Sequence, residues 1–159
     1  MISVGIITVS DRASRGVYED KGGPALQRYC EKCRWNISAQ AIVPDQKAVI
    51  QRRTIKFSGR CDVILLTGGT GITKRDVTPE AVRSIATKEL PGFGEVMRAR
   101  SFARFPHAIL SRSLAVVVGK SLVICLPGSP KGALECLEVV ATAIPHAVEL
   151  LRNASTVHR

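Results

Sequence analysis

Short apolar runs alternate with longer polar or amphipathic segments along most of this 159-residue chain. The runs are rich in Val, Ile and Leu, which is typical of strands buried on both faces of a parallel sheet. They cover residues 2–9, 37–43, 63–66, 114–118 and 122–126. Aromatic residues make up only 4% of the chain, so the core has to be aliphatic. The alternation predicts an α/β three-layer sandwich, with helices on both faces of a largely parallel sheet.

Helix signals occupy the segments between these runs, apart from a polar loop over residues 10–21. Helices are predicted over residues 25–35, 46–58, 78 to about 88, 93–103 and from 130 onward. Ser129 caps the last helix and Pro130 opens it, while Pro145 kinks or restarts it. Gly119-Lys120 joins the last two apolar runs into a small β-hairpin in the C-terminal third. Without repeats or linkers, the chain is predicted to be one domain over residues 1–159.

The formal net charge of +10 favours anionic partners. The basic residues are spread along the chain with few aromatics between them, which argues against nucleic-acid binding. No stretch approaches the roughly 20 apolar residues that span a bilayer, so no membrane association is expected. Five cysteines, an odd number, suit a reducing compartment. Asp11 and Arg12 end the apolar start too early for a signal sequence, so we expect a cytoplasmic protein.

The segment Cys30-Glu31-Lys32-Cys33 has the spacing of a redox or zinc pair. It falls inside the first predicted helix, however, and no second pair or nearby histidine completes a metal site. We therefore interpret both cysteines as core or surface thiols, because free cysteine usually behaves as a small hydrophobic residue.

Polar or glycine-rich loops follow four of the predicted strands. They begin at Ser10-Asp11, Pro44-Asp45, Gly68 and Pro127. Ligands of open α/β sheets bind beyond the carboxyl ends of the strands, so these loops should share one edge. Gly68-Gly69-Thr70-Gly71 can offer unhindered backbone N–H groups to a phosphate, or it can be a plain glycine turn.

Two aspartates in these loops are candidates for phosphate chemistry. Asp45 and Asp76 would provide hard oxygen ligands for Mg²⁺ near the phosphates of a nucleotide. Each has another interpretation, since Asp45 is well placed to cap the helix that starts at Gln46, and Asp76 can be a turn residue. Their position after two adjacent strands favours the functional interpretation.

The chain resembles the MoaB/Mog family of molybdenum-cofactor proteins, in particular its bacterial molybdopterin adenylyltransferases, and it is also similar to the N-terminal domain of gephyrin. The matching stretches are Thr8–Ser14, Tyr18–Gly22, Val43–Asp45, Leu66–Pro79, Pro91–Glu95, Leu110–Arg112 and Leu126–Lys131. The most specific is Thr67-Gly68-Gly69-Thr70-Gly71, followed after four residues by Asp76-Val77-Thr78-Pro79. The resemblance therefore rests on ordered motifs along nearly the whole chain.

The resemblance implies a homotrimeric enzyme that transfers AMP from Mg-ATP to the terminal phosphate of molybdopterin, releasing pyrophosphate. The family's catalytic aspartates fall on Asp45 and Asp76, which would also hold Mg²⁺. The other pocket positions that match are Ser10, Asp11, Asp20, Gly68, Gly69, Thr70, Gly71, Glu95, Ser111, Ser129 and Lys131. A molybdenum-insertion protein is implied as the downstream partner.

Two other functions are compatible with the same motifs. A family member that binds molybdopterin without turning over ATP is one, although Asp45, Asp76 and the Tyr18–Gly22 stretch favour the enzyme. A scaffold like gephyrin is the other, but scaffolding there depends on further domains and a linker. The resemblance therefore favours the adenylyltransferase.

Overall fold

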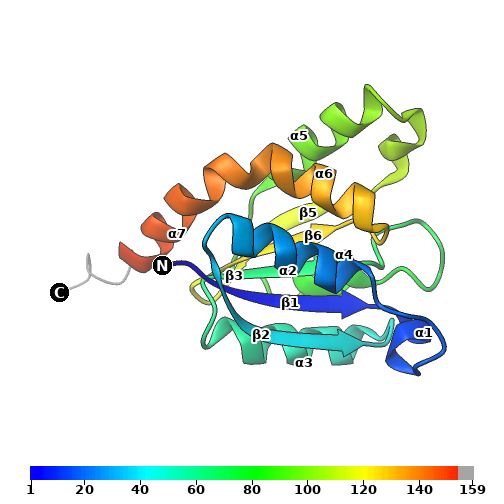
Figure 1. The fold of residues 1–159 in the computed structure, drawn as a ribbon, viewed down its shortest axis with the longest axis horizontal. Helices are drawn as coiled ribbons and strands as arrows, with labels where there is room; N and C mark the ends of the chain where they lie inside the picture. Colours follow the sequence, from blue (N-terminus) through cyan, green and yellow to red (C-terminus); the bar gives the residue numbers. More distant parts are fainter. Residues whose placement is uncertain (154–159) are drawn as a thin grey trace.

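A single six-stranded sheet organises the computed structural model, which describes residues 1–153 (Figure 1). The strand order is β2-β1-β3-β6-β5-β4. The bounds are β1 (Ser3–Val9), β2 (Asn36–Val43), β3 (Val63–Thr67), β4 (Lys88–Glu89), β5 (Leu114–Val118) and β6 (Ser121–Leu126). β2, β1, β3 and β6 are parallel, whereas β5 is antiparallel to both β6 and β4. The largely parallel sheet and the β5–β6 hairpin confirm the prediction.

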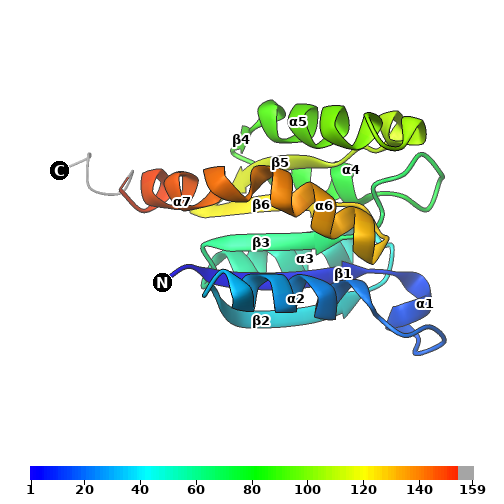
Figure 2. The ribbon, with the colours of Figure 1, turned by 45° about the horizontal axis from the view of Figure 1, so that its top comes forward.

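Helices cover both faces of this sheet (Figure 2). They are α1 (Asp11–Ser14), α2 (Gly22–Lys32), α3 (Lys47–Ser58), α4 (Thr78–Arg83), α5 (Pro91–Phe102), α6 (Pro130–Val140) and α7 (Ile144–Asn153), with the 3-10 turns η1 (Pro106–Leu110) and η2 (Ala141–Ala143). α2, α5, α6 and α7 pack on one face, and α3 and α4 pack on the other. The three-layer sandwich is confirmed.

Alternate residues of the central strands enter two separate cores, because successive side chains of a strand point to opposite faces. On one face Ile6 packs with Leu26 of α2 and Leu137 of α6. On the other face Ile7 packs with Phe57 of α3. Burial on both faces explains why these strands read as continuous apolar runs.

The carboxyl ends of four strands meet at one edge of the sheet. Val9 pairs with Val43, and Thr67 pairs with both Thr8 and Leu126, so the ends lie in register. Figure 1 shows α1 and the start of α6 at this edge. The prediction that the loops after β1, β2, β3 and β6 open on the same edge is therefore confirmed.

Short elements differ most from the predictions. The predicted loop over residues 10–21 contains α1, which is capped by the Ser10 side chain accepting from Ala13 N at 3.1 Å. The helix predicted up to Lys88 ends at Arg83, because the chain then joins the sheet edge: Thr87 N donates to Val117 O. η1 was not predicted either. Single helical turns carry too few residues to show a period.

The helix α2 also starts and ends earlier than the predicted range of 25–35. It begins at Gly22 and ends at Lys32 because Arg34 adopts a left-handed φ of 59°. Trp35 N then donates to Cys30 O at 2.9 Å, as in a Schellman cap. Cys30 is fully buried in the core of this face, which agrees with its interpretation as a core thiol.

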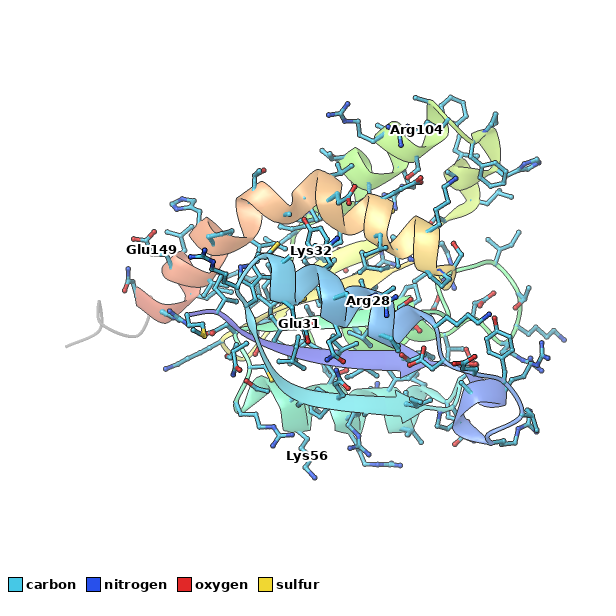
Figure 3. The ribbon with its side chains drawn as sticks, viewed as in Figure 1. Arg28, Glu31, Lys32, Lys56, Arg104 and Glu149 are labelled. Carbon is cyan, nitrogen blue, oxygen red and sulfur yellow. The ribbon has the colours of Figure 1, made fainter. Side chains whose placement is uncertain are left out.

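The charged side chains are distributed over several helices instead of one face. Figure 3 shows Arg28 and Lys32 on α2, Lys56 on α3 and Arg104 just after α5, each on the outside of the molecule. None of the helices within residues 1–153 combines the length and apolar character required to cross a bilayer.

Candidate functional site

A cleft of about 270 Å³ lies at the carboxyl edge of the sheet, and we call it the aspartate cleft. Its walls come from the ends of β1 and β3, the loops after β1 and β2, α1, and the start of α6. Of the predicted site residues, it is lined by Ser10, Asp11, Asp20, Asp45, Gly68 and Gly69. Six predicted positions from four separate motifs thus share one depression, as the parallel strand order requires.

Asp11 and Asp45 hold each other by a reciprocal pair of hydrogen bonds. Asp11 N donates to Asp45 Oδ2 at 2.8 Å, and Asp45 N donates to Asp11 Oδ1 at 2.9 Å. The prediction that Asp45 caps α3 is therefore wrong: the N-cap is Gln46, and no side chain caps this helix. The Asp45 carboxylate instead joins the loop after β2 to the loop after β1.

The electrostatic surroundings of Asp45 disfavour its charge. Burial raises its pKa above the ordinary value, and the neighbouring carboxylates of Asp11 and Asp76 raise it further. The Asp11 backbone N–H and the Arg75 guanidinium act in the opposite direction but do not outweigh these effects. A bound cation would stabilise the charged form of such a carboxylate. Groups with a pKa shifted in this way are typical of functional sites.

The glycine loop after β3 adopts a backbone that side chains would obstruct. Gly68 and Gly69 have φ values of +103° and +69°. A Cβ on Gly69 would lie 2.3 Å from Thr78 Oγ1 and 3.3 Å from Asp45 Oδ1. Thr78 holds the loop from α4, with Oγ1 donating to Gly68 O at 2.9 Å and N donating to Gly69 O at 3.1 Å. Glycine is therefore required here for both conformation and space.

Asp76 stabilises the turn at the end of the same loop. Its Oδ2 accepts from Thr73 N at 3.0 Å and from Thr73 Oγ1 at 2.7 Å. A Cβ on Gly71 would lie 2.7 Å from this oxygen, so the carboxylate crosses the loop backbone closely. Asp76 also acts on the pKa of Asp45. The turn interpretation of Asp76 is therefore confirmed, and its functional role stays a prediction. Asp76 is not among the residues that line the aspartate cleft. The expectation that Asp45 and Asp76 follow adjacent strands is wrong, because β1 lies between β2 and β3 in the sheet.

Cationic and aromatic residues of the aspartate cleft were not among the predicted site residues. Arg12, Tyr18, Lys21 and Arg75 all line it. Arg75 Nε lies 3.4 Å from Asp11 Oδ2, and the Arg12 guanidinium lies 5.1 Å from the centre of the Tyr18 ring. All four lie in stretches that carry the family resemblance, which was the available signal. Neither those stretches nor the scattered positive charge reveals which side chains meet in space.

The remaining predicted residues lie elsewhere or have structural partners. Ser111 and Ser129 line a neighbouring cavity of about 230 Å³, which we call the serine cavity. Ser129 Oγ accepts from Gly132 N at 3.1 Å, which confirms that it caps α6. Glu95 lines a third depression on the α5 side, together with Ser111. Lys131 is exposed on the first turn of α6.

Asp20 and Thr70 support the fold around the cleft. Asp20 accepts from Thr8 Oγ1 at 2.9 Å and from Gly23 N at 3.0 Å, and so joins β1 to the start of α2. Thr70 is buried, and its carbonyl accepts from Arg112 N at 2.8 Å. Both residues keep cleft-forming segments together.

The carboxylates in and beside the aspartate cleft fit a metal ion that brings most of its other ligands with it. Among residues 1–153 no group of three or more His, Cys, Asp or Glu side chains is arranged to hold a metal ion. Mg²⁺ is usually bound by one or two carboxylates together with substrate phosphates and water. Asp45 and Asp76 have the hard oxygen donors for this. Burial is the main cause that raises the pKa of Asp45, and the nearby carboxylates of Asp11 and Asp76 add to it.

Fold and cleft together define a class of α/β protein that presents carboxylates, cations and a glycine loop to an anionic ligand at the carboxyl edge of its sheet. The chain belongs to the MoaB/Mog family of molybdopterin-binding domains. A sequence model of this family, described as "Probable molybdopterin binding domain", matches residues 5–146. The match includes the aspartate cleft, the serine cavity and all four loops at the carboxyl edge.

Individual relatives agree with this family. A Helicobacter pylori protein named molybdopterin adenylyltransferase is 46% identical over 154 residues, covering 94% of this chain and 88% of the relative. Gephyrin from Dictyostelium discoideum is 39% identical, over 94% of this chain but only 22% of gephyrin. The crystal structure of the molybdopterin biosynthesis enzyme MoaB from Thermus thermophilus has a TM-score of 0.89 at 41% identity, covering 95% and 96% of the two chains.

Proposed function

We propose that this protein is a molybdopterin adenylyltransferase of molybdenum-cofactor biosynthesis. It transfers AMP from Mg-ATP to the terminal phosphate of molybdopterin and releases pyrophosphate. The observation that carries this conclusion is the 46% identity, over 94% of the chain, to a protein named for that activity. The five cysteines, all free, suit the reducing cytoplasm in which we place the reaction.

The chemistry requires two polyanions to meet so that a phosphate oxygen of the pterin attacks the α-phosphorus of ATP in line. Arg12, Lys21 and Arg75 bring positive charge to the aspartate cleft, which offsets part of the phosphate repulsion. Gly69 lines the same cleft and adds no side chain of its own between a phosphate and the loop backbone. No covalent nucleophile is required, because positioning and charge stabilisation account for phosphoryl-type transfer.

Asp45 and Asp76 are the residues that we propose as ligands for Mg²⁺ entering with ATP. When bound, the ion supplies positive charge to the phosphate oxygens and to the pyrophosphate leaving group. The protein contributes the fixed position of the carboxylates, since Asp11 N holds Asp45 Oδ2 and Thr73 holds Asp76 Oδ2. On this side the proposed site also includes Ser10, Asp11, Asp20, Gly68 and Gly69, which line the cleft, and Thr70 and Gly71 of the same glycine loop. We add Ser111 and Ser129 from the serine cavity, Glu95 from the depression on the α5 side, and Lys131 from the first turn of α6.

The direct test is incubation of the purified protein with Mg-ATP and molybdopterin. We expect adenylylated pterin and pyrophosphate in equal amounts. Asp76→Asn should fold normally and reduce turnover by roughly 10²-fold or more, the scale of removing one electrostatic stabiliser. Wild-type turnover in that variant would remove Asp76 from the proposed site.

A passive molybdopterin-binding protein is the second candidate, because the glycine loop and the start of α6 would suffice to hold a phosphate. A passive binder would not need a carboxylate at Asp45, where burial and neighbouring carboxylates disfavour the charge. Binding of molybdopterin without any binding of ATP would favour this alternative.

The family resemblance further leads us to propose a homotrimer that passes its product to a molybdenum-insertion protein. Exposed apolar residues on α5, on η1 and in the short link between them support a self-association surface: Val96, Phe102, Phe105, Ile109 and Leu110. Light scattering of the purified protein should give three times the chain mass. A monomer at micromolar concentration would contradict this part of the proposal.

A further inference from the structure

Arg112 lies between η1 and β5 and contacts both ends of the loop that carries Asp76. Its Nε donates to Gly71 O at 2.8 Å, and its Nη2 donates to Asp76 O at 2.9 Å. Its third guanidinium nitrogen, Nη1, forms an ion pair with Glu80 on α4. A single guanidinium therefore joins the first residue of the loop, the last residue of the loop and the following helix.

We infer that Arg112 is a positioning residue, which holds the loop from Gly71 to Asp76, and with it the Asp76 carboxylate, in the arrangement that adenylyl transfer requires. This inference rests on the proposed function for its catalytic part. Its structural part, that Arg112 fixes the loop, does not depend on any activity.

Packing alone cannot fix this loop. Ile72, Thr73, Lys74 and Arg75 are all exposed, so the loop buries little apolar surface. Within the loop, Thr73 donates to the Asp76 carboxylate, which shapes the turn but does not attach it to the rest of the protein. Thr78 binds Gly68 and Gly69 just before the loop, and the ion pair of Arg75 with Asp11 at 3.4 Å joins a largely exposed loop side chain to α1. Only the Arg112 side chain, among the described contacts, binds backbone carbonyls at both ends of the loop.

The geometry of the contact requires arginine and not merely positive charge. Guanidinium offers several donors in a rigid plane, which lets it reach two carbonyls and a carboxylate at once, whereas an ammonium group is a point donor on a flexible stem. Glu80 orients the guanidinium from the α4 side, and the hydrogen bond from Arg112 in turn lowers the pKa of Glu80. The Arg112 backbone N–H adds a further bond to Thr70 O at 2.8 Å.

The first measurement uses Arg112→Lys, which keeps the positive charge and removes the planar guanidinium with its several donors. We expect kcat with Mg-ATP and molybdopterin to fall by at least about tenfold, since small misplacements of a reacting group cost one to two orders of magnitude. KM for molybdopterin should change little, and the Mg²⁺ concentration for half-maximal rate should rise. Arg83→Lys is the matched control. Arg83 lies on the same helix as Glu80, and it forms an exposed ion pair with Glu89 of β4 at 3.0 Å.

The second measurement needs no activity. Trypsin cuts after Lys74 or Arg75, both exposed in the loop, and the cut rate reports how often the loop opens. In Arg112→Lys this cleavage should be faster than in wild type by about fivefold or more at an unchanged melting temperature. Glu80→Gln, which keeps an acceptor for Arg112, should show a smaller effect in the same direction and replaces Arg112→Lys if that variant does not fold.

The two measurements separate the possible failures. Wild-type cleavage in Arg112→Lys would overturn the inference whatever the activity. Faster cleavage with unchanged kcat and Mg²⁺ dependence would reduce Arg112 to a structural residue and would also overturn it. If the wild-type protein itself shows no turnover, the proposed function fails, and the cleavage assay still decides whether Arg112 holds the loop.

Discussion

The two ends of the sheet treat an aspartate in opposite ways. At the amino end, Asp62 precedes β3 and receives hydrogen bonds from Ser3 N and Ser3 Oγ, both at 2.8 Å. Arg152 at the end of α7 donates to both of its oxygens, at 2.9 and 2.7 Å. At the carboxyl end, Asp45 accepts one backbone N–H from Asp11, and the carboxylates of Asp11 and Asp76 oppose its charge more than the Arg75 guanidinium favours it.

The pKa values of the two groups follow from this difference. Burial would raise the pKa of Asp62, but the hydrogen bonds from Arg152 and Ser3 outweigh it and lower the pKa to about 2. For Asp45, burial and nearby carboxylates prevail and raise the pKa. Asp62 in its charged form therefore stabilises the fold, whereas charged Asp45 costs stability. Carboxylates held at such a cost are typical of sites that await a ligand.

The largest expected effect comes from removing the charge at the carboxyl end. Asp45→Asn should reduce turnover by roughly 10²-fold or more, because one carboxylate near the phosphates is lost. The melting temperature at neutral pH should stay the same or rise, since asparagine still accepts from Asp11 N without a buried charge. A variant that loses stability along with activity would contradict the claim that Asp45 is strained.

The backbone of the carboxyl end provides the next test. Gly69→Ala should lower the free energy of unfolding by about 3 kcal/mol, since the left-handed φ and the collision with Thr78 Oγ1 both add cost. Gly16→Ala is the matched control, because Gly16 has a similar φ of +73° but open space around it. Urea unfolding should show a smaller loss for Gly16→Ala. Equal losses would mean that only the φ angle matters at Gly69.

At the amino end the expected effect is on stability alone. Asp62→Asn should lower the free energy of unfolding by about 2 kcal/mol, the scale of hydrogen bonds to a charged group. Turnover of the folded variant should equal that of wild type, because Asp62 lies at the opposite edge from the aspartate cleft. Thermal unfolding and an adenylylation assay provide the two readouts, and reduced turnover per folded molecule would break the separation of the two ends.

Acid should affect the two ends in sequence. Because the pKa of Asp45 is raised above the ordinary aspartate value of 3.8, this carboxylate takes up a proton at a higher pH than an ordinary aspartate does. As the pH falls, Mg²⁺-dependent ATP binding should therefore weaken first, while the fold persists. The lowered pKa of Asp62 means that its stabilisation is complete above the unfolded value and is lost as the pH falls from about 3.9 toward 2. Calorimetry and circular dichroism on one pH series would reveal the order. Unfolding before the loss of ATP binding would contradict it.

The sequence predicted the sheet and the main helices better than the local contacts between residues. Continuous apolar runs and their alternation with helices predicted the parallel sheet and the shared edge, because burial on both faces leaves a clear pattern. The elements that were missed, α1, β4 and η1, are each one turn or a two-residue pairing. Their position depends on neighbours such as Val117, which pairs with Lys88 across the sheet edge.

The sequence identified residues that share the aspartate cleft, but it did not reveal their hydrogen-bond partners. The predictions were wrong or incomplete where those partners lie far away in the sequence. The capping position of Asp45 looked sufficient by sequence, but the partner of its carboxylate is Asp11, 34 residues away. Arg112 lies in a stretch that carries the family resemblance, yet its role comes from carbonyls at Gly71 and Asp76 on another loop. Such contacts leave no spacing in the sequence that could reveal them.

We propose that the carboxyl end binds nucleotide through Mg²⁺ held by Asp45 and Asp76, and that burial and neighbouring carboxylates disfavour the charge of Asp45 until the ion binds. Titration of ATP into wild type, Asp45→Asn and Asp62→Asn, each with and without Mg²⁺, tests it most directly. We expect strong Mg²⁺ dependence in wild type and in Asp62→Asn, and its loss in Asp45→Asn. Mg²⁺-dependent binding that survives in Asp45→Asn, or ATP binding that is absent from all three proteins, would contradict it.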